Sequence, residues 1–423
     1  MHIKDFTKRI LPNSVVEFIQ HLNTIKTIKK THKNYEKVVS NLQNEIKNRP
    51  IRFASYVVFD SAFGAKKLYE LMKNDDKFDA KIVIIPDTAR GEENLKKCYN
   101  ATKEFFIKNY GKEMVLDGWD EKTGEFLDHS DKFDIIYCAN PYDDMVHKLH
   151  KISYLSKKNV LPVYIPYAFY PFEYCNKEIA PLFSMSLFWK IFLDSKITFE
   201  EFKKFEIIKA KNAIVTGYAK MDDFINLNKI NNSKKSIIIA PHHTIKNGSA
   251  LQISNFLYYY DFILELPNIF PNINFIFRPH PLLFVNLVNY GFWSELEVDN
   301  YIEKIKKSMT YSVGGDYLKI FANADGIVHD CSSFIAEWLF SGKKGCFVSF
   351  DSKVFSQLSK FGKKALSFYD IAKNKEDIIS YITSIENDKI DNLNLENMED
   401  IIVNYPNASK KILDEIKTTL KLV

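Results

Sequence analysis

Residues 327–337 read IVHDCSSFIAE and residues 277–281 read FRPHP, and these two stretches decide the predicted fold. In each, an apolar run typical of a buried strand ends abruptly in small, polar and ionisable residues. Ligands of open α/β folds bind at such strand ends. The first stretch continues into a predicted helix over 334–340, so Ser332 and Ser333 fall at its N-terminus. Because unpaired backbone N–H groups and the helix dipole favour an anion there, a phosphate group is the expected ligand.

Predicted strands and helices alternate along most of the chain. In the first half the strands cover 51–59, 80–86, 133–139, 160–167 and 212–216, and the helices cover 65–73 and 92–109. In the second half the strands cover 236–240, 273–277, 326–329 and 345–350, and the helices cover 258–266, 317–322 and 334–340. Strands separated by helices imply parallel, doubly wound sheets. We therefore expect an α/β fold with two Rossmann-like domains that face each other across a cleft.

Length and local composition divide the chain into parts. One hydrophobic core seldom serves 423 residues, so two domains are expected. Residues 226–235 are rich in Asn, Lys and Ser, which is typical of an interdomain linker. The predicted parts are an N-terminal helical segment at 1–50, Rossmann-like domains at 51–225 and 235–400, and a C-terminal helix at 401–423.

Composition and charge exclude several classes of protein. Apolar residues make up 46% of the chain, which indicates a folded globular protein. The net charge of +5 is small for this length and the charges are interleaved, so no nucleic-acid partner is expected. The five cysteines lack CxxC spacing, which favours a reducing cytosol. The N-terminus lacks a signal-peptide core and no apolar run reaches ~18 residues, so we expect a cytoplasmic protein without a membrane span.

The N-terminal segment carries a basic face. Lysines recur there at near-helical spacing among apolar residues. The lysines are Lys26, Lys29, Lys30, Lys33 and Lys37, and the apolar residues are Val15, Phe18, Ile19, Leu22, Ile25 and Ile28. Such a helix either packs on its own domain with a solvated face, or lies on the inner face of the cytoplasmic membrane near a lipid-linked acceptor.

His280 and Arg278 directly follow a predicted strand, and both suit chemistry on a phosphate group. His280 lies between two prolines that prevent a helical continuation, and Arg278 lies two residues earlier on the same side of an extended chain. Arginine neutralises phosphate charge, and histidine moves protons at neutral pH. A histidine that only ends a loop is the alternative, but His242 and His243 follow another predicted strand in the same half and favour a catalytic role. No carboxylate triad or HxxxH spacing accompanies these histidines, so no metal is predicted.

The residues after the strand at 326–329 suit a nucleotide diphosphate. Asp330, Ser332 and Ser333 combine polar side chains with helix-terminal N–H groups, and Glu337 lies one helical turn further on, where a carboxylate reaches ribose hydroxyls. The alternative is that Ser333 only caps the helix. The chain has no GxGxxG loop and no P-loop motif, which disfavours dinucleotide-dependent dehydrogenases and kinases.

Four short motifs occur in order over residues 214–350. They are Thr216-Gly217-Tyr218 with Asp222, Ala240-Pro241, Arg278-Pro279-His280-Pro281, and Asp330-Cys331-Ser332-Ser333 with Glu337. In this order they resemble the motifs of the CDP-glycerol glycerophosphotransferases, a family of teichoic-acid and capsule polymerases. The resemblance implies a GT-B fold in which 235–400 binds the activated donor and the acceptor approaches from 51–225. It implies no cofactor beyond a substrate such as CDP-glycerol.

The resemblance also implies roles for single residues. His280 resembles the family's active-site histidine in the donor domain, and Arg278 resembles its companion in the same motif. Ser332 and Ser333 resemble the serine pair that contacts the donor phosphates. Gly217, His329, Asp330 and Glu337 complete the predicted donor-binding residues.

The chain departs from the family pattern at two places. The family has a histidine at a strand end of the N-terminal half, often taken as the base that activates the acceptor hydroxyl, whereas residues 164–169 read YIPYAF here. His242 or His243 is the predicted replacement for that base, unless the donor is a different one. The second departure is His329, which stands where the family usually has a small residue.

The predicted activity is transfer of glycerol phosphate, or a related phospho-linked group, from a CDP-linked donor to a hydroxyl of a surface polysaccharide or its lipid-linked precursor. The first alternative is a GT-B glycosyltransferase that uses a nucleotide sugar. The second is a non-catalytic scaffold of a capsule-assembly complex, which the missing histidine and the basic N-terminal helix would suit.

Overall fold

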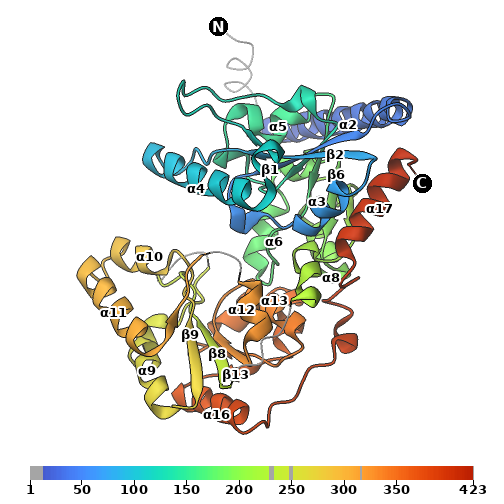
Figure 1. Cartoon of the computed structure of the whole chain (residues 1–423). Helices are drawn as coiled ribbons and strands as arrows, with labels where there is room; N and C mark the ends of the chain where they lie inside the picture. Colours follow the sequence, from blue (N-terminus) through green and yellow to red (C-terminus); the bar gives the residue numbers. More distant parts are fainter. Residues whose placement is uncertain (1–12, 228–232, 247–250, 315–316, 423) are drawn as a thin grey trace.

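The chain forms two parallel β-sheets, one above the other in Figure 1. The computed structural model describes residues 13–227, 233–246, 251–314 and 317–422. The upper sheet has the order β3-β2-β1-β4-β5-β6-β7, with β1 (Ile51–Val57), β2 (Phe78–Ile84), β3 (Val115–Asp117), β4 (Ile135–Cys138), β5 (Leu161–Tyr164), β6 (Lys190–Leu193) and β7 (Ala213–Val215). The lower sheet has the order β10-β9-β8-β11-β12-β13, with β8 (Lys235–Ala240), β9 (Ile273–Phe277), β10 (Thr310–Tyr311), β11 (Gly326–His329), β12 (Cys346–Val348) and β13 (Asp370–Ala372).

Helices connect the strands and cover the sheets. In the first half they are α2 (Asn13–Glu45), α3 (Lys66–Lys73), α4 (Glu92–Tyr110), α5 (Ile152–Leu155), α6 (Glu173–Ile179), α7 (Phe183–Leu187), α8 (Lys196–Phe205) and the 3-10 helix η6 (Ala219–Asn226). In the second half they are α9 (Phe256–Ile269), α10 (Leu283–Asn289), α11 (Glu295–Ser308), α12 (Leu318–Asn323), α13 (Phe334–Glu337), the 3-10 helix η7 (Trp338–Ser341), α14 (Lys353–Gln357), α15 (Lys360–Leu366), α16 (Lys375–Glu386) and α17 (Ala408–Leu420).

The predicted α/β fold class is confirmed. All strand pairs in both sheets are parallel. The sequence did not predict β3, β6, β10 and β13, because they have only two to four residues and begin or end in polar side chains such as Asp117, Lys190 and Asp370. The predicted helix at 334–340 is the short α-helix α13 continued by the 3-10 helix η7. Residues 1–12 of the predicted N-terminal segment and 228–232 of the predicted linker lie outside the described residues.

The C-terminal segment returns from the lower half to the upper half, where α17 packs beside α3 (Figure 1). Its apolar residues Ile412, Leu413 and Ile416 belong to the same core cluster as β1 and β2. Asp222 accepts hydrogen bonds from the first two backbone N–H groups of α17, those of Ala408 at 3.1 Å and Ser409 at 2.6 Å. The motif around residues 216–222 therefore holds the crossing segment in place.

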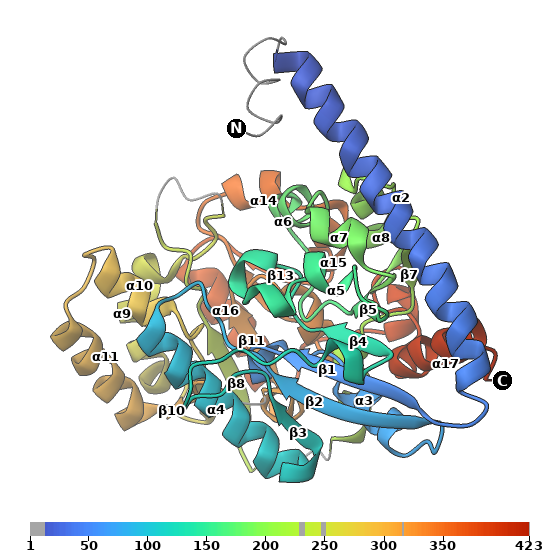
Figure 2. The same cartoon turned by 90° about the horizontal axis from the view of Figure 1, so that it is seen from above.

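Helix α2 is in part a packed helix and in part an exposed one. Ile28, Tyr35, Val38 and Leu42 are buried against the upper half, as the structural alternative predicted. Ile19 and Leu22 remain 43% and 42% exposed, and the five lysines of the basic face are all exposed. Figure 2 shows this end of α2 extending past the rest of the molecule. Among the described residues, no helix is both long and apolar enough to cross a membrane.

Candidate functional site

The candidate site lies where β9, β8 and β11, three neighbours in the lower sheet, reach their carboxyl ends. The loops that follow them are tied together by hydrogen bonds. The backbone N–H of Arg278 donates to the Ile239 carbonyl at 2.8 Å, and that of His280 donates to the Pro241 carbonyl at 3.0 Å. Because parallel strands end at one edge of a sheet, the motifs at 240–243, 278–280 and 330–333 meet there.

Asp330 joins the loop after β8 to the loop after β11. It is fully buried, and its two oxygens accept the backbone N–H groups of His242 and Asn255, each at 2.5 Å. Burial raises the pKa of Asp330 to about 7, while these hydrogen bonds act in the opposite direction. Asp330 therefore positions the loop that carries His242 and His243, and its contact with a donor phosphate stays a prediction.

His242, His243 and His280 come together, as a shared catalytic role requires. Their ring centroids are 4.4 Å apart for His242 and His243, 4.1 Å for His243 and His280, and 5.1 Å for His242 and His280. One ring nitrogen of each lies within 4.8 Å of one ring nitrogen of the other two. Such a cluster suits either a transition metal or a group rich in hydrogen-bond acceptors.

The hydrogen bonds of the rings favour a ligand rich in hydrogen-bond acceptors over a transition metal. The Leu282 N–H donates to Nδ1 of His280 at 3.1 Å, so the proton of the neutral ring is on Nε2. Asn286 Nδ2 lies 3.1 Å from Nδ1 of His243 and donates to the His243 carbonyl at 3.0 Å. Since a carbonyl only accepts, this atom of Asn286 is the amide nitrogen, and it donates to the His243 ring as well. The proton of the neutral His243 ring is therefore also on Nε2. A metal-bound histidine instead donates from its second nitrogen. The cluster therefore presents N–H donors, which suit phosphate oxygens.

Burial and mutual repulsion keep the rings neutral. Burial, with the proximity of His243, lowers the pKa of His280 to about 3. Burial lowers the pKa of His242 well below its usual range, and the neighbouring histidines lower it further. Burial also lowers the pKa of His243. An anion among these rings would favour their protonated forms, because it would offset both effects.

Arg278 is held at the same edge by the loop after β10. Its guanidinium donates to Ser312 Oγ at 2.7 Å and to the Gly314 carbonyl at 2.8 Å, and it lies over the Tyr317 ring at 5.5 Å. The Tyr317 hydroxyl donates to Glu337 Oε2 at 2.5 Å. Tyr317 therefore links the arginine–histidine tip to the helix that follows the serine pair, and the sequence alone did not single it out.

Glu337 connects the two halves of the molecule. It is fully buried, and its Oε1 accepts the Tyr218 hydroxyl at 2.8 Å and lies 3.5 Å from Lys220 Nζ. The Tyr218 hydroxyl is also 2.8 Å from the Tyr167 carbonyl, within the segment that lacks the family histidine. That strand end of the upper sheet therefore lies beside the donor motifs. A ribose contact of Glu337, which would replace one of these bonds, stays a prediction.

Ser332 and Ser333 are half-buried at the start of α13. Ser333 is the N-cap residue of α13, but its side chain makes no capping hydrogen bond. Among the described residues neither serine hydroxyl takes part in a hydrogen bond, which leaves both available to a ligand. The contact of this pair with donor phosphates stays a prediction.

His329 and Gly217 have surroundings that differ from those of the other predicted site residues. His329 is fully buried among Phe334, Phe347 and Tyr369, its Nδ1 accepts the Cys331 N–H, and burial lowers its pKa to about 3. Gly217 lies under the crossing C-terminal segment. Their contacts with a donor stay predictions.

Replacing Tyr317 with phenylalanine is expected to lower the free energy of unfolding by about 2 kcal/mol, because the buried Glu337 carboxylate loses a hydrogen bond to a charged group. The phenyl ring keeps its stacking on Arg278. Urea denaturation measures the change, with Tyr258→Phe as the matched control at a side chain 66% exposed. Equal effects of the two substitutions would contradict the linking role of Tyr317.

The two halves, each with a parallel sheet and facing strand ends, define a GT-B-like fold. No family model matches the sequence, and no curated protein matches it. Solved structures match over most of the chain at low identity. The chain is similar to the UDP-GlcNAc 2-epimerase from Methanocaldococcus jannaschii, with 12% identity and a TM-score of 0.55 over 87% of this chain and 100% of that chain. It is also similar to the UDP-GlcNAc 2-epimerase from Neisseria meningitidis bound to UDP-GlcNAc, with 13% identity and a TM-score of 0.54. This match covers 87% of this chain and 100% of that chain.

The wall teichoic acid polymerase TagF, in a variant soaked with CDPG, is similar in fold as well. Its identity is 15% and its TM-score 0.50, over 97% of this chain and 99% of that chain. All three similar proteins are enzymes; the Neisseria enzyme is bound to UDP-GlcNAc, and the TagF variant was soaked with CDPG. At these identities the likeness establishes the GT-B-like fold and leaves the activity open.

Proposed function

We propose that this protein transfers glycerol phosphate, or a related phospho-linked group, from a CDP-linked donor to a hydroxyl of a cell-surface polysaccharide or its lipid-linked precursor. The observation that carries the proposal is that the N–H donors of His243 and His280 lie with Arg278 at the carboxyl edge of the lower sheet. These groups can hydrogen-bond and neutralise a diphosphate. The TagF likeness adds support, because it covers 97% of this chain, whereas the two epimerases cover 87%.

The proposed reaction is a displacement at phosphorus. The acceptor oxygen forms a bond to the phosphorus that bears glycerol, the bond from that phosphorus to the bridging oxygen breaks, and CMP leaves with the electron pair. The hydroxyl proton passes to a base, for which His242 is the candidate, because His243, the other predicted base, carries its proton on Nε2 and accepts a hydrogen bond on Nδ1. Such transfers depend mainly on positioning and charge stabilisation. His280, Arg278 and the serine pair would supply both.

Donor affinity is expected to rise as the pH falls below neutrality. In the free protein the pKa of His280 is lowered to about 3, and the charge of a bound diphosphate raises it. The complex then binds protons that the free protein does not, so binding strengthens as the pH falls from the pKa of the complex towards 3. Calorimetry with CDP-glycerol in buffers of different ionisation enthalpy measures this proton uptake. Affinity independent of pH between 8 and 5, with no proton uptake, would contradict protonation of these rings in the complex and leave them only the role of neutral hydrogen-bond donors.

A peripheral membrane contact through α2 is part of the proposal. The exposed lysines and the apolar residues Ile19 and Leu22 suit an anionic lipid surface, and each lysine near such a surface contributes roughly 1 kcal/mol. In sedimentation with anionic vesicles, we expect the unmodified protein to be found in the vesicle pellet. The variant Lys26→Ala/Lys29→Ala/Lys30→Ala/Lys33→Ala is expected to stay in the supernatant. Equal retention by neutral and anionic vesicles would remove this contact from the proposal.

Donor identity is tested by thermal stabilisation with CDP-, UDP- and GDP-linked compounds, followed by product analysis. A ligand that binds only the folded state raises its melting temperature. The expected result is stabilisation by CDP-glycerol and release of CMP when an acceptor glycan is present. Stabilisation by a nucleotide sugar with release of a nucleoside diphosphate would identify a glycosyltransferase instead. Isomerisation of UDP-GlcNAc without any acceptor would identify an epimerase.

A further inference from the structure

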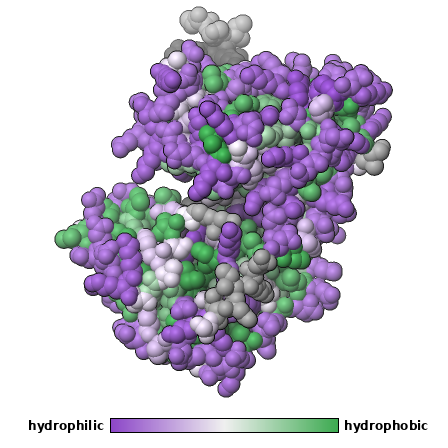
Figure 3. Space-filling model, viewed as in Figure 1, coloured by the Kyte–Doolittle hydropathy of each residue, from purple (hydrophilic) through white to green (hydrophobic). Residues whose placement is uncertain are grey.

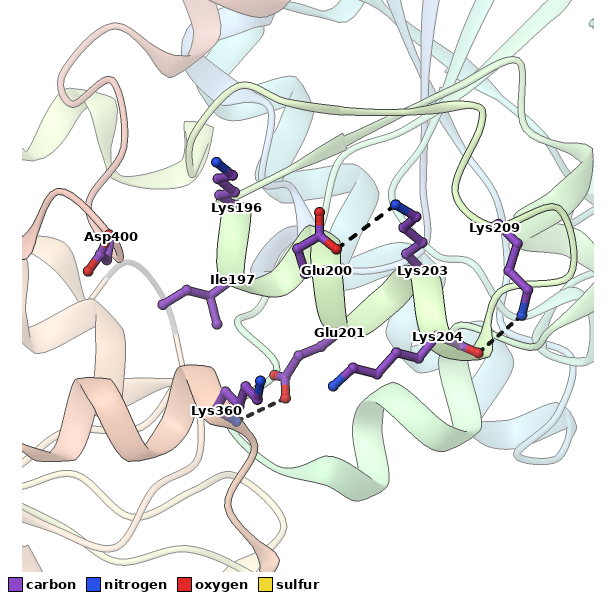
Figure 4. Close-up of a pocket in the computed structure, with 9 residues that line it drawn as sticks. All are labelled: Lys196, Ile197, Glu200, Glu201, Lys203, Lys204, Lys209, Lys360 and Asp400. Carbon is purple, nitrogen blue, oxygen red and sulfur yellow. Dashed lines mark hydrogen bonds and ion pairs between the residues drawn. The ribbon is translucent and has the colours of Figure 1, made fainter.

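A cavity of about 710 Å³ lies outside the candidate site, between α8 of the upper half and α15 of the lower half (Figure 4). Its lining residues are Lys196, Ile197, Glu200, Glu201, Lys203, Lys204, Lys209, Lys360 and Asp400. The two halves are joined near this place, because the Ser359 N–H donates to the Pro171 carbonyl at 2.9 Å. Figure 3 shows the outline of the molecule narrowing between the halves. A ligand in this cavity would contact both halves.

The charges around the cavity are not balanced. Five of the nine lining residues are lysines and three are acidic. Lys203 pairs with Glu200 at 4.0 Å, and Lys209 Nζ donates to the Lys204 carbonyl at 3.3 Å. Within the described residues, the ammonium groups of Lys196, Lys204 and Lys360 form no ion pair with a carboxylate. Because the lysines outnumber the acidic residues, the lining has a net positive charge, which favours an anion.

Glu201 adds a second, independent feature. Its residue is 5% exposed, and its Oε1 accepts the backbone N–H of Lys360 at 3.0 Å. Its Oε2 is buried and has no hydrogen-bond partner. A buried carboxylate oxygen without a partner is unfavourable, and a hydroxyl donor would satisfy it. The cavity therefore combines ammonium groups for an anion with a carboxylate oxygen for a hydroxyl group.

We propose that this cavity binds a polyol phosphate or sugar phosphate segment of the acceptor chain. The phosphate would lie between Lys204 and Lys360, and a hydroxyl of the same segment would donate to Glu201 Oε2. This assignment rests on the proposed transferase function, because a phosphodiester-linked glycan is the product of that reaction. A chain held at both places would stay bound between successive transfers.

The test measures binding of a synthetic three-unit glycerol phosphate oligomer by calorimetry. The double variant Lys204→Ala/Lys360→Ala is expected to bind it at least tenfold more weakly than the unmodified protein. The control Lys304→Ala/Lys307→Ala removes the same charge from exposed positions on α11 and is expected to bind normally. Glu201→Gln removes the carboxylate acceptor and its charge, so it is expected to weaken the binding of the oligomer relative to the binding of inorganic phosphate. If both double variants weaken oligomer binding equally, or if neither weakens it, the cavity site is overturned.

CDP-glycerol binding to the same variants separates this proposal from the transferase. Unchanged donor binding with weakened oligomer binding supports both proposals. If CDP-glycerol fails to bind the unmodified protein but the oligomer still needs Lys204 and Lys360, the transferase fails and the cavity site stands. If donor binding and transfer succeed while the cavity variants bind and extend the oligomer normally, the cavity site fails alone.

Discussion

Replacing His280 with alanine is expected to reduce glycerol phosphate transfer by about 10²–10³-fold, which is typical for the loss of one donor that stabilises developing oxyanion charge. The ring is neutral near pH 7 and carries its proton on Nε2, so it acts as a hydrogen-bond donor towards phosphate oxygens. The backbone bond from His280 to Pro241 does not depend on the side chain and should keep the loop in place. Initial rates of CMP release with CDP-glycerol and an acceptor glycan measure the loss.

His280→Gln is the control for the nature of that role. Glutamine keeps an N–H donor but does not titrate, so partial recovery of the rate identifies hydrogen bonding, and no recovery identifies proton transfer or ring geometry. An unchanged rate in His280→Ala, with an unchanged melting temperature, would remove His280 from the catalytic residues. Full biological activity of that variant would favour the non-catalytic scaffold.

Replacing Gly217 with alanine is expected to lower the free energy of unfolding by about 3 kcal/mol. Gly217 has φ +97°, and a Cβ there would lie 2.1 Å from the Val403 carbonyl oxygen. The backbone conformation costs a non-glycine residue about 1 kcal/mol, and forced overpacking adds roughly 2 kcal/mol. Because the Val403 carbonyl belongs to the crossing C-terminal segment, the substitution should loosen the attachment of α17. Denaturation in urea measures the loss.

Gly291→Ala is the matched control. Gly291 also has a positive φ, +70°, but a Cβ there meets nothing within 4 Å. Its substitution should cost about 1 kcal/mol, from the backbone conformation alone. If both substitutions cost the same, contact with the C-terminal segment does not explain the glycine in the motif at 216–218. A large loss of donor affinity in Gly217→Ala without loss of stability would support the donor contact predicted from the sequence.

The local patterns of the sequence were sufficient for the fold class and for the strands that carry the site. β8, β9 and β11 are apolar runs that end in sharp changes of polarity, and such changes mark strand ends in α/β folds. Since parallel strands share their carboxyl edge, the grouping of His242, His243 and His280 needed only that β8 and β9 be neighbours. The short strands β3, β6, β10 and β13 carry no comparable pattern, because sheet pairing rather than local composition stabilises them.

Contacts between segments far apart in the sequence could not be predicted from it. Tyr218 and Glu337 are 119 positions apart, and nothing in their spacing indicates that they share a hydrogen bond. The same holds for Asp222, which accepts the first N–H groups of α17. These contacts depend on how the two halves and the crossing segment pack. Such packing is a property of the whole chain, so a short motif identifies the residues without identifying their partners.

A crystal of the protein soaked with CDP-glycerol would test most directly where the donor binds. The expected density places the diphosphate within hydrogen-bond distance of the His243 and His280 rings on one side and of Ser332 and Ser333 on the other. A nucleotide seated elsewhere, with these side chains contacting only protein or water, would contradict the proposed transferase site.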